Sequence, residues 1–214
     1  MKALVTGATG ATGKDLVKKL LADNAFSEVH IFVRRPAGLQ HNKLTVHVVD
    51  FDRSDTWKHL VTGDVAFSCL GTTLRAAGSK EAQWKIDHDY QYSFASAART
   101  NGVPNYILVS AAGANPASFI FYSKMKGQLE QKIEKLAFDK TVLFQPGPLL
   151  RDNSDRAAEQ FGVAVIRFCN RLGLLQSHKP LPTETLAAAM ANAARTAKPG
   201  VQRLSTKQIF ALAY

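Results

Sequence analysis

Short apolar runs of strand length alternate with helical patterns over residues 1–150. Residues 2–6 and 64–71 are continuous apolar runs, which is typical of strands that are buried on both faces. The six predicted strands cover residues 2–6, 28–34, 43–50, 64–71, 105–110 and 140–146. The predicted helices between them cover residues 14–24, 54–60, 79–101 and 117–137. Strands that alternate with helices imply right-handed crossovers, so the pattern predicts an α/β fold with a doubly wound parallel sheet.

The alternation ends after the sequence Pro146-Gly147-Pro148. Helical patterns continue over residues 155–172 and 183–197, and a last short helix is expected over residues 209–213. Residues 151–214 are too few for an independent domain of ordinary size. We therefore expect one domain over residues 1–214, with a cofactor-binding core in residues 1–150 and a small helical cap on the substrate side in residues 151–214.

Composition and charge narrow the class of protein. The chain has 214 residues, 46% of them hydrophobic, and a net charge of +10. It contains no run of 18 apolar residues and no signal-peptide pattern, so no integral membrane segment is expected. Acidic residues are interleaved with the basic ones along the helices, which argues against nucleic acid as a partner. Cys69 and Cys169 lack the spacing of a metal site, which indicates a reducing cytoplasm and no metal.

Three glycines lie at the junction between the first predicted strand and the first predicted helix. Gly7 would permit the tight turn, Gly10 the close approach of a pyrophosphate, and Gly13 the packing of the helix against the strand. The amino end of the helix offers free N–H groups and a positive dipole end to the phosphates. In this strand–turn–helix context the motif predicts a Rossmann-type dinucleotide site.

The residues after the second and third predicted strands bear on the choice of dinucleotide. Arg34 and Arg35 stand where NAD-specific folds carry an acid, and a guanidinium suits the 2′-phosphate of NADP(H). We therefore expect NADP(H) to be preferred, with NAD(H) possible. Asp50 and Asp52 would meet the adenine amino group or cap the next helix.

A proton donor for hydride transfer is expected on the carboxyl side of the sheet. Ser110 ends the fifth predicted strand, Tyr122 follows on the next helix, and Lys126 lies one turn beyond Tyr122 on the same face. The lysine would lower the pKa of the phenol from about 10 towards neutral, while Ser110 would orient a substrate oxygen. A tyrosine and a lysine at this spacing are also common on basic helices, so the spacing alone leaves both interpretations open.

Other polar residues are given structural interpretations. Cys69 is expected to be a buried and inert thiol. His30 and His47 alternate with apolar residues in strands and are expected to be structural or exposed to solvent. Polar side chains at four consecutive positions of one long helix are expected to point in different directions: Asp87, His88, Asp89 and Tyr90.

Several motifs resemble the short-chain dehydrogenase/reductase superfamily: TGATGATG, Ser110 and the pair Tyr122-x-x-x-Lys126. The blocks CLGTT, VSAAGAN and FYSKMKG are similar to its atypical, Tat-interactive-protein-like subgroup of NAD(P)-binding oxidoreductases. The resemblance implies that Ser110, Tyr122 and Lys126 form the active site and that Gly127 lets the helix lie near the cofactor. It implies a cofactor site formed by Gly7, Thr9, Gly10, Ala11, Thr12, Gly13, Arg34, Arg35, Asp50, Phe51, Cys69, Leu70, Gly71, Thr72, Tyr122, Lys126 and Pro146.

One departure from the family pattern affects the substrate side. Gln145 stands before Pro146-Gly147, where the family usually has arginine, and this removes a charge near the nicotinamide or the substrate. The leading hypothesis is an NADP(H)-dependent oxidoreductase acting on a small carbonyl or alcohol substrate, as a monomer or homodimer. The alternatives are a non-catalytic NADP(H)-binding redox sensor or regulatory interaction protein and, more weakly, an epimerase-like activity.

Overall fold

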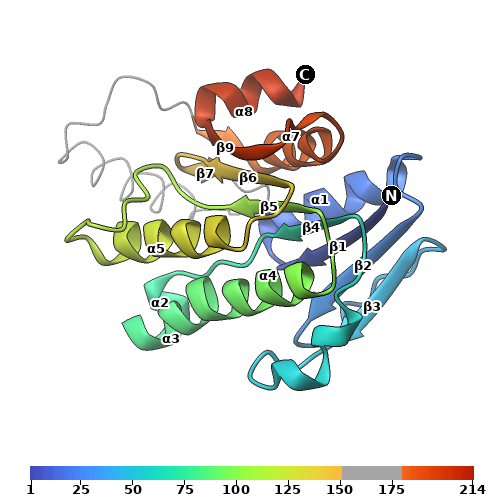
Figure 1. The fold of residues 1–214 in the computed structure, drawn as a ribbon, viewed down its shortest axis with the longest axis horizontal. Helices are drawn as coiled ribbons and strands as arrows, with labels where there is room; N and C mark the ends of the chain where they lie inside the picture. Colours follow the sequence, from blue (N-terminus) through green and yellow to red (C-terminus); the bar gives the residue numbers. More distant parts are fainter. Residues whose placement is uncertain (151–179) are drawn as a thin grey trace.

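A seven-stranded, all-parallel sheet forms the centre of the molecule (Figure 1). The computed structural model describes residues 1–150 and 180–214, so the helix expected over residues 155–172 lies outside the described residues. The strand order is β3-β2-β1-β4-β5-β6-β9, which is the doubly wound arrangement with its switch point between β1 and β4. The strands are β1 (Lys2–Thr6), β2 (Glu28–Val33), β3 (Leu44–Val48), β4 (Val65–Ser68), β5 (Asn105–Val109), β6 (Lys140–Gln145) and β9 (Gly200–Ser205).

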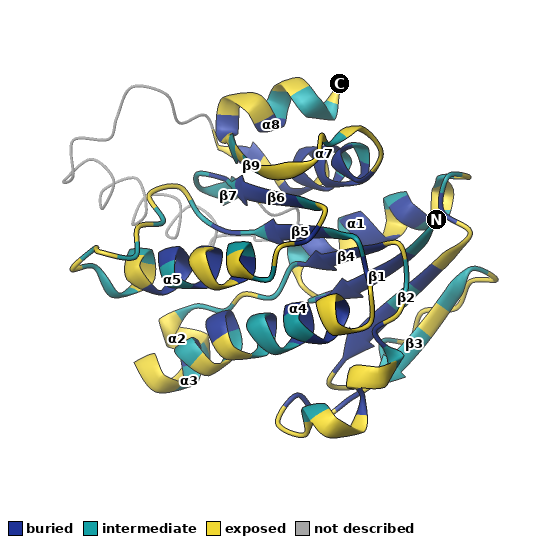
Figure 2. Cartoon of the chain, viewed as in Figure 1, coloured by how far each residue is buried: buried dark blue, intermediate teal, exposed yellow. Residues whose placement is uncertain are grey.

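Helices cover both faces of this sheet, which confirms the predicted Rossmann-type fold class (Figure 1). One face packs against α1 (Ala11–Ala22), α7 (Thr183–Thr196) and α8 (Thr206–Ala213). The other face packs against α4 (Tyr90–Thr100) and α5 (Phe121–Lys135). Figure 2 shows that the buried residues of these helices face the sheet.

Alternation along the strands explains why there are two separate cores. Val5 and Ile31 pack with α1 and α7, whereas their neighbours Leu4 and Phe32 pack with α4. Successive side chains of a strand point to opposite faces, so a central strand that is apolar at every position supplies both cores.

The helix predicted over residues 79–101 forms with a local widening. It begins as α3 (Lys80–Trp84), passes through a π-helical segment (Lys85–Asp89) and continues as α4. Its amino end is capped by the Ser79 hydroxyl, which accepts the N–H of Ala82 at 3.1 Å. The π-helical segment inserts an extra residue into the turn and is the part of the helix that reaches the site described below.

Two segments differ from the sequence-based expectation. Instead of one helix over residues 54–60 there are two 3₁₀ turns, Ser54–Thr56 and Lys58–Leu60, on either side of Trp57. Trp57 interrupts the helix because its indole is buried and donates to the Asp50 carbonyl at 2.8 Å. Strand β9 was not predicted, since its sequence GVQRLS is polar and lies at the edge of the sheet.

The remaining short elements are α2 (Leu74–Ala77) and the small parallel pair β7 (Leu149–Leu150) and β8 (Leu181–Pro182). In residues 1–150 and 180–214 no helix has both the length and the apolar composition needed to cross a bilayer. The expected division into a core and a cap at residue 150 stays a prediction.

Candidate functional site

The loop between β1 and α1 is shaped by backbone contacts at two of its glycines. Gly7 has a φ of +78°, and a Cβ added there would overlap the carbonyl of Cys69 and the nitrogen of Leu70. A Cβ added at Gly13 would overlap the Gly7 carbonyl and lie 2.9 Å from Ala8 Cα. These two glycines therefore let the chain turn and let α1 approach β1.

At Gly10, unlike at these two glycines, the space that a Cβ would occupy is almost free of other atoms. The residue is exposed, and a Cβ added there would meet only the Gly7 carbonyl oxygen, at 3.3 Å. As the N-cap of α1 it provides no side-chain cap, and the first turn of the helix contains no acidic residue. Among the described residues the first-turn N–H groups, from Ala11 to Gly13, therefore lack the usual capping partners. Such an amino end fits the diphosphate of a dinucleotide.

The carboxyl end of β2 lies next to that of β1, which leads into this loop, and the carboxyl end of β3 lies one strand further out. Arg34 and Arg35 directly follow β2; both are exposed and form no ion pair within residues 1–150 and 180–214. Asp50 is exposed after β3 and accepts the N–H of Asp52 at 3.0 Å. The Phe51 ring is buried against Trp57, with 5.5 Å between ring centroids, so its side chain belongs to the core.

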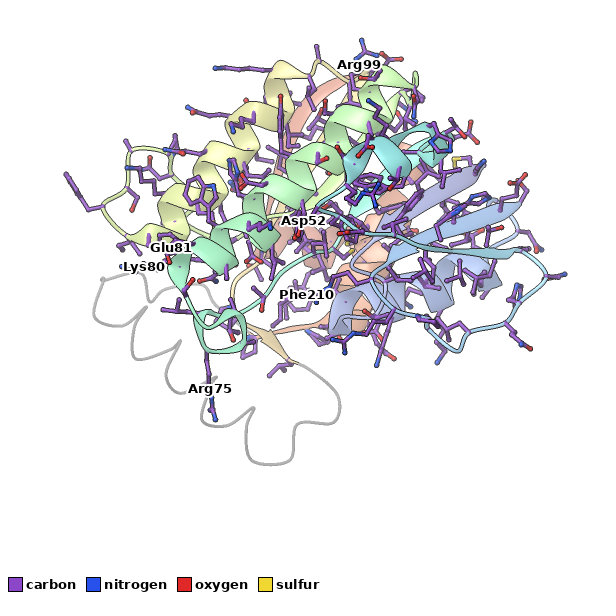
Figure 3. All side chains as sticks on the ribbon, turned by 90° about the horizontal axis from the view of Figure 1, so that it is seen from below. Asp52, Arg75, Lys80, Glu81, Arg99 and Phe210 are labelled. Carbon is purple, nitrogen blue, oxygen red and sulfur yellow. The ribbon has the colours of Figure 1, made fainter. Side chains whose placement is uncertain are left out.

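Asp52 lies between the β3 edge and the helix that contains the π-helical segment (Figure 3). It accepts a hydrogen bond from the Tyr90 hydroxyl at 2.8 Å and pairs with Lys85 Nζ at 2.6 Å. The bond from Lys85 is the largest cause of its lowered pKa. Arg75, on α2, extends away from the helices and the sheet (Figure 3).

The loop after β4 carries the predicted residues Cys69, Leu70, Gly71 and Thr72. The Cys69 N–H donates to the Thr6 carbonyl at 2.9 Å, which holds the start of the loop against the glycine turn. Burial raises the pKa of the Cys69 thiol to about 12, so the group is protonated at neutral pH. Thr72 is tied to the long helix at two points: its N–H donates to Asp87 Oδ1 at 2.7 Å, and its carbonyl accepts from Gln83 Nε2 at 3.1 Å.

Asp87 is a buried charge that the sequence analysis passed over. Asp87 and His88 are both 1% exposed, and they have different partners: Asp87 accepts from Thr72, whereas His88 bonds to Asp89. Within the described residues Asp87 Oδ2 has no hydrogen-bond partner. Burial raises the pKa of this carboxyl, while Lys126 and the Thr72 N–H act in the opposite direction. The π-helical segment turns both residues inward, and a regular helical pattern does not reveal such a segment.

The structure brings Tyr122 and Lys126 together on α5. Lys126 is 2% exposed, and its Nζ lies 5.9 Å from the centroid of the Tyr122 ring. Ser110 is buried directly after β5, where its N–H donates to the Phe144 carbonyl at 2.7 Å. Its hydroxyl, however, donates to Glu130 Oε1 and makes no hydrogen bond to Tyr122 among the described residues.

The pKa of the Tyr122 phenol is shifted in the direction opposite to the one expected from Lys126. The pKa of the Tyr122 phenol is raised, by burial of the hydroxyl first and by the negative charge of Asp87 second. The residue as a whole is 41% exposed, so burial acts on only part of it and the charge of Asp87 gives the firmer reason. Burial lowers the pKa of Lys126, opposed by Asp87 and Glu130. The expected lowering of the phenol pKa is therefore wrong, because burial of the hydroxyl and the charge of Asp87 both raise the pKa.

Glu130 is a second buried charge that was missed. It lies on the same face of α5 as Tyr122 and Lys126, at intervals of four residues. Gln145 Nε2 donates to its two carboxylate oxygens at 3.0 and 3.1 Å, and Arg203 Nε of β9 lies 3.7 Å from Oε2. Gln145 thus contacts a carboxylate, and the unpredicted strand β9 supplies a cation beside it.

Gly127 and Pro146 contact the loop after β5. A Cβ added at Gly127 would overlap the backbone of Asn115 and Pro116, so this glycine admits the loop rather than a cofactor. Pro146 is buried, and its carbonyl accepts the N–H of Ala112 at 2.9 Å. The loop over residues 111–120 is thereby fixed against the start of α5.

Comparisons with known proteins agree with this geometry. A family model described as NAD(P)H-binding matches residues 7–156. Protein HTATIP2 of Rattus norvegicus is 38% identical over 155 residues, which are 71% of this chain and 64% of that protein. The mitochondrial protein FMP52 of Saccharomyces cerevisiae is 37% identical over 166 residues, which are 76% of this chain and 71% of that protein. The match to the rat protein thus spans less than two thirds of its length.

Solved structures share the fold at low identity. The UDP-glucose 4-epimerase of Thermotoga maritima has a TM-score of 0.70 and 16% identity, with 100% of this chain and 81% of that chain covered. The oxidoreductase ylbE of Lactococcus lactis has a TM-score of 0.70 and 17% identity, with 99% and 96% covered. At such identities the likeness concerns the fold alone.

The names of the relatives correct the expected location. FMP52 proteins of Saccharomyces cerevisiae, Eremothecium gossypii and Kluyveromyces lactis are named mitochondrial, so the expectation of a cytoplasmic protein is wrong. That expectation rested on two cysteines without a disulfide or metal pattern. Such cysteine usage indicates a reducing environment but does not say which reducing compartment is meant.

Proposed function

The chain belongs to the NAD(P)H-binding family, in the atypical short-chain dehydrogenase/reductase group, and from this premise we propose that it is an NADP(H)-dependent reductase of carbonyl compounds. One observation carries the proposal: a buried lysine, Lys126, lies beside Tyr122 at the edge of the sheet where the glycine loop exposes an uncapped helix end. A fully buried lysine is rare without a function or a charged partner. Ligands of open α/β sheets bind at this carboxyl edge.

The residues present fit a dinucleotide. The loop from Gly7 to Gly13 would hold the diphosphate on the free N–H groups of α1, and the exposed guanidiniums of Arg34 and Arg35 would take the 2′-phosphate. Lys126 would reach the nicotinamide ribose. When bound, the nicotinamide supplies or accepts the hydride.

Tyr122 acts as the acid in this proposal. The phenol carries its proton at neutral pH, as an unperturbed tyrosine does, and can donate it to a carbonyl oxygen in the direction of reduction. In the reduction the carbonyl carbon would accept a hydride from the reduced cofactor, the oxygen would take the proton of Tyr122, and the phenolate would regain a proton from solvent. Lys126 holds positive charge beside the phenolate while it exists.

A non-catalytic NADP(H)-binding sensor is the second candidate. It is favoured by the Ser110 hydroxyl, which is already bonded to Glu130 rather than free for a substrate oxygen. The cofactor loop would serve a sensor equally well. The two proposals therefore differ only in whether a carbonyl compound is turned over.

Two measurements on the purified chain separate them. Fluorescence titration measures NADPH binding, and the loss of NADPH absorbance is followed with a panel of ketones and aldehydes. We expect turnover that Tyr122→Phe reduces by at least about 100-fold, with NADPH affinity unchanged. Tight NADPH binding without turnover of any carbonyl compound would replace the reductase by the sensor. Absence of NADPH binding would refute both.

A further inference from the structure

Glu130 is surrounded by hydrogen-bond donors. Its Oε1 accepts the Ser110 hydroxyl, Gln145 Nε2 reaches both oxygens at 3.0 and 3.1 Å, and Arg203 Nε lies 3.7 Å from Oε2. An ionised carboxylate only accepts hydrogen bonds, and each of these described groups donates. Lys126, one turn earlier on α5, adds a further positive charge near it. The environment therefore suits a carboxylate at Glu130.

The strand pattern explains how Ser110 and Gln145 reach the same carboxylate. Leu108 and Leu143 point to the face of the sheet that is covered by α5, and side chains two positions later on a strand point the same way. Ser110 follows Leu108 at this spacing, and Gln145 follows Leu143. Glu130 meets both from the helix above them.

This arrangement decides what Ser110 offers to a substrate. A serine hydroxyl has one proton and two lone pairs. With the proton directed to Glu130, the oxygen of Ser110 presents only lone pairs to any other group. It can accept a hydrogen bond from a substrate, but it cannot donate one to a carbonyl oxygen.

We propose that Glu130 is a positioning residue that makes Ser110 a hydrogen-bond acceptor, and that the substrate is a carbonyl compound with a hydroxyl group on the adjacent carbon. This inference rests on the proposed function. The carbonyl oxygen accepts from Tyr122, and the adjacent hydroxyl donates to Ser110. A plain ketone has no donor for Ser110, so it forgoes the hydrogen bond that the lone pairs of the serine oxygen could accept.

The test compares two matched ketones, 2-hydroxycyclohexanone and cyclohexanone. The full chain is loaded with 1,4,5,6-tetrahydro-NADP, which cannot transfer a hydride, and dissociation constants are measured by ligand-observed NMR. We expect the hydroxy ketone to bind about tenfold more tightly, the size of one net hydrogen bond. In Ser110→Ala this ratio should fall to about one. A purely structural change would weaken both ketones alike and leave the ratio unchanged.

Glu130→Gln tests the role of the carboxylate. The new amide can donate to Ser110 Oγ, which frees the serine proton for a carbonyl oxygen. Cyclohexanone should then bind more tightly, and the ratio should approach one. Glu134→Gln is the matched control, because Glu134 also pairs with Arg203 but has no bond to Ser110; it should keep the wild-type ratio.

Three outcomes would overturn the inference: equal binding of the two ketones to the wild type, a preference that survives Glu130→Gln, or no binding of either ketone. If Glu130→Gln does not fold, a preference that persists in Ser110→Ala overturns it instead. Failure of the proposed function is recognised separately, by absent NADPH binding or by absent turnover across the wider panel of carbonyl compounds.

Discussion

Substitution of Gly13 by alanine should destabilise the protein despite the gain in helix propensity. The new Cβ would overlap the Gly7 carbonyl oxygen and lie 2.8 Å from the Gly7 carbonyl carbon and 2.9 Å from Ala8 Cα. These are backbone atoms, so no side chain can rotate away, and α1 must move from β1. Insertion of a methyl group into a tightly packed site costs about 1–3 kcal/mol.

Two effects partly cancel in this variant. Gly13 lies inside α1, where alanine is favoured over glycine by about 1 kcal/mol. The expected net loss is therefore up to about 2 kcal/mol, which for a chain of this size lowers the melting temperature by up to about 8 °C. The glycine loop would also be displaced, so NADPH affinity should fall with stability.

The assay is thermal unfolding followed by circular dichroism, together with NADPH titration by fluorescence. Gly71→Ala is the matched control, because a Cβ there meets nothing within 4 Å and the residue is not in the left-handed region. It should melt within about 2 °C of the wild type. A Gly13→Ala variant as stable as the wild type, with unchanged NADPH affinity, would refute the close contact between α1 and the glycine turn.

Three further predictions concern charge and titration. The double variant Arg34→Ala/Arg35→Ala should lose about tenfold or more in NADPH affinity and little in NADH affinity, as measured by fluorescence titration; equal losses would contradict the 2′-phosphate assignment. His30 and His47 form a ring-to-ring hydrogen bond of 2.9 Å, and burial lowers both pKa values from 6.5, so they add stability above pH 6.5 that is lost as the pH falls below it. A melting temperature that does not fall between pH 7 and pH 5, or that falls equally in His47→Gln, would count against this. Cys69 should react with a disulfide reagent much more slowly in the folded than in the unfolded protein, because burial keeps its pKa near 12.

The parts of the fold that were predicted correctly are those with a strong local pattern. The strand around Leu4 has an apolar centre, Ala3–Val5, and the glycines between β1 and α1 mark the turn that follows it. Strand β9 was missed because an edge strand is exposed along one side and GVQRLS carries no apolar run. The helix expected around Trp57 failed because one buried indole, bonded to a distant carbonyl, outweighed the local propensity.

The sequence predicted only the part of the candidate site whose residues lie at a fixed spacing on one helix. Tyr122 and Lys126 lie one turn apart on a single helix, so their proximity follows from the sequence. Asp87 comes from another helix and faces them only because a π-helical segment turns it inward, which no regular pattern indicates. Glu130 lies on the same face of α5 as Tyr122 and Lys126, but its contact with Ser110 depends on how α5 lies over the sheet.

The direction of the Tyr122 pKa shift was mispredicted because the sequence shows only the neighbours on one helix and not those that the fold brings close. A lysine alone beside a phenol stabilises the phenolate, and the sequence displays only that pair. In the fold Lys126 is shared by two carboxylates, Asp87 and Glu130, each contributed by tertiary packing. Burial of the hydroxyl is the first cause of the raised Tyr122 pKa and the negative charge of Asp87 is the second, so the phenol keeps its proton at neutral pH. A phenol that rests in its protonated form is the donor in the proposed reduction, and its phenolate accepts the proton when the same reaction runs in reverse.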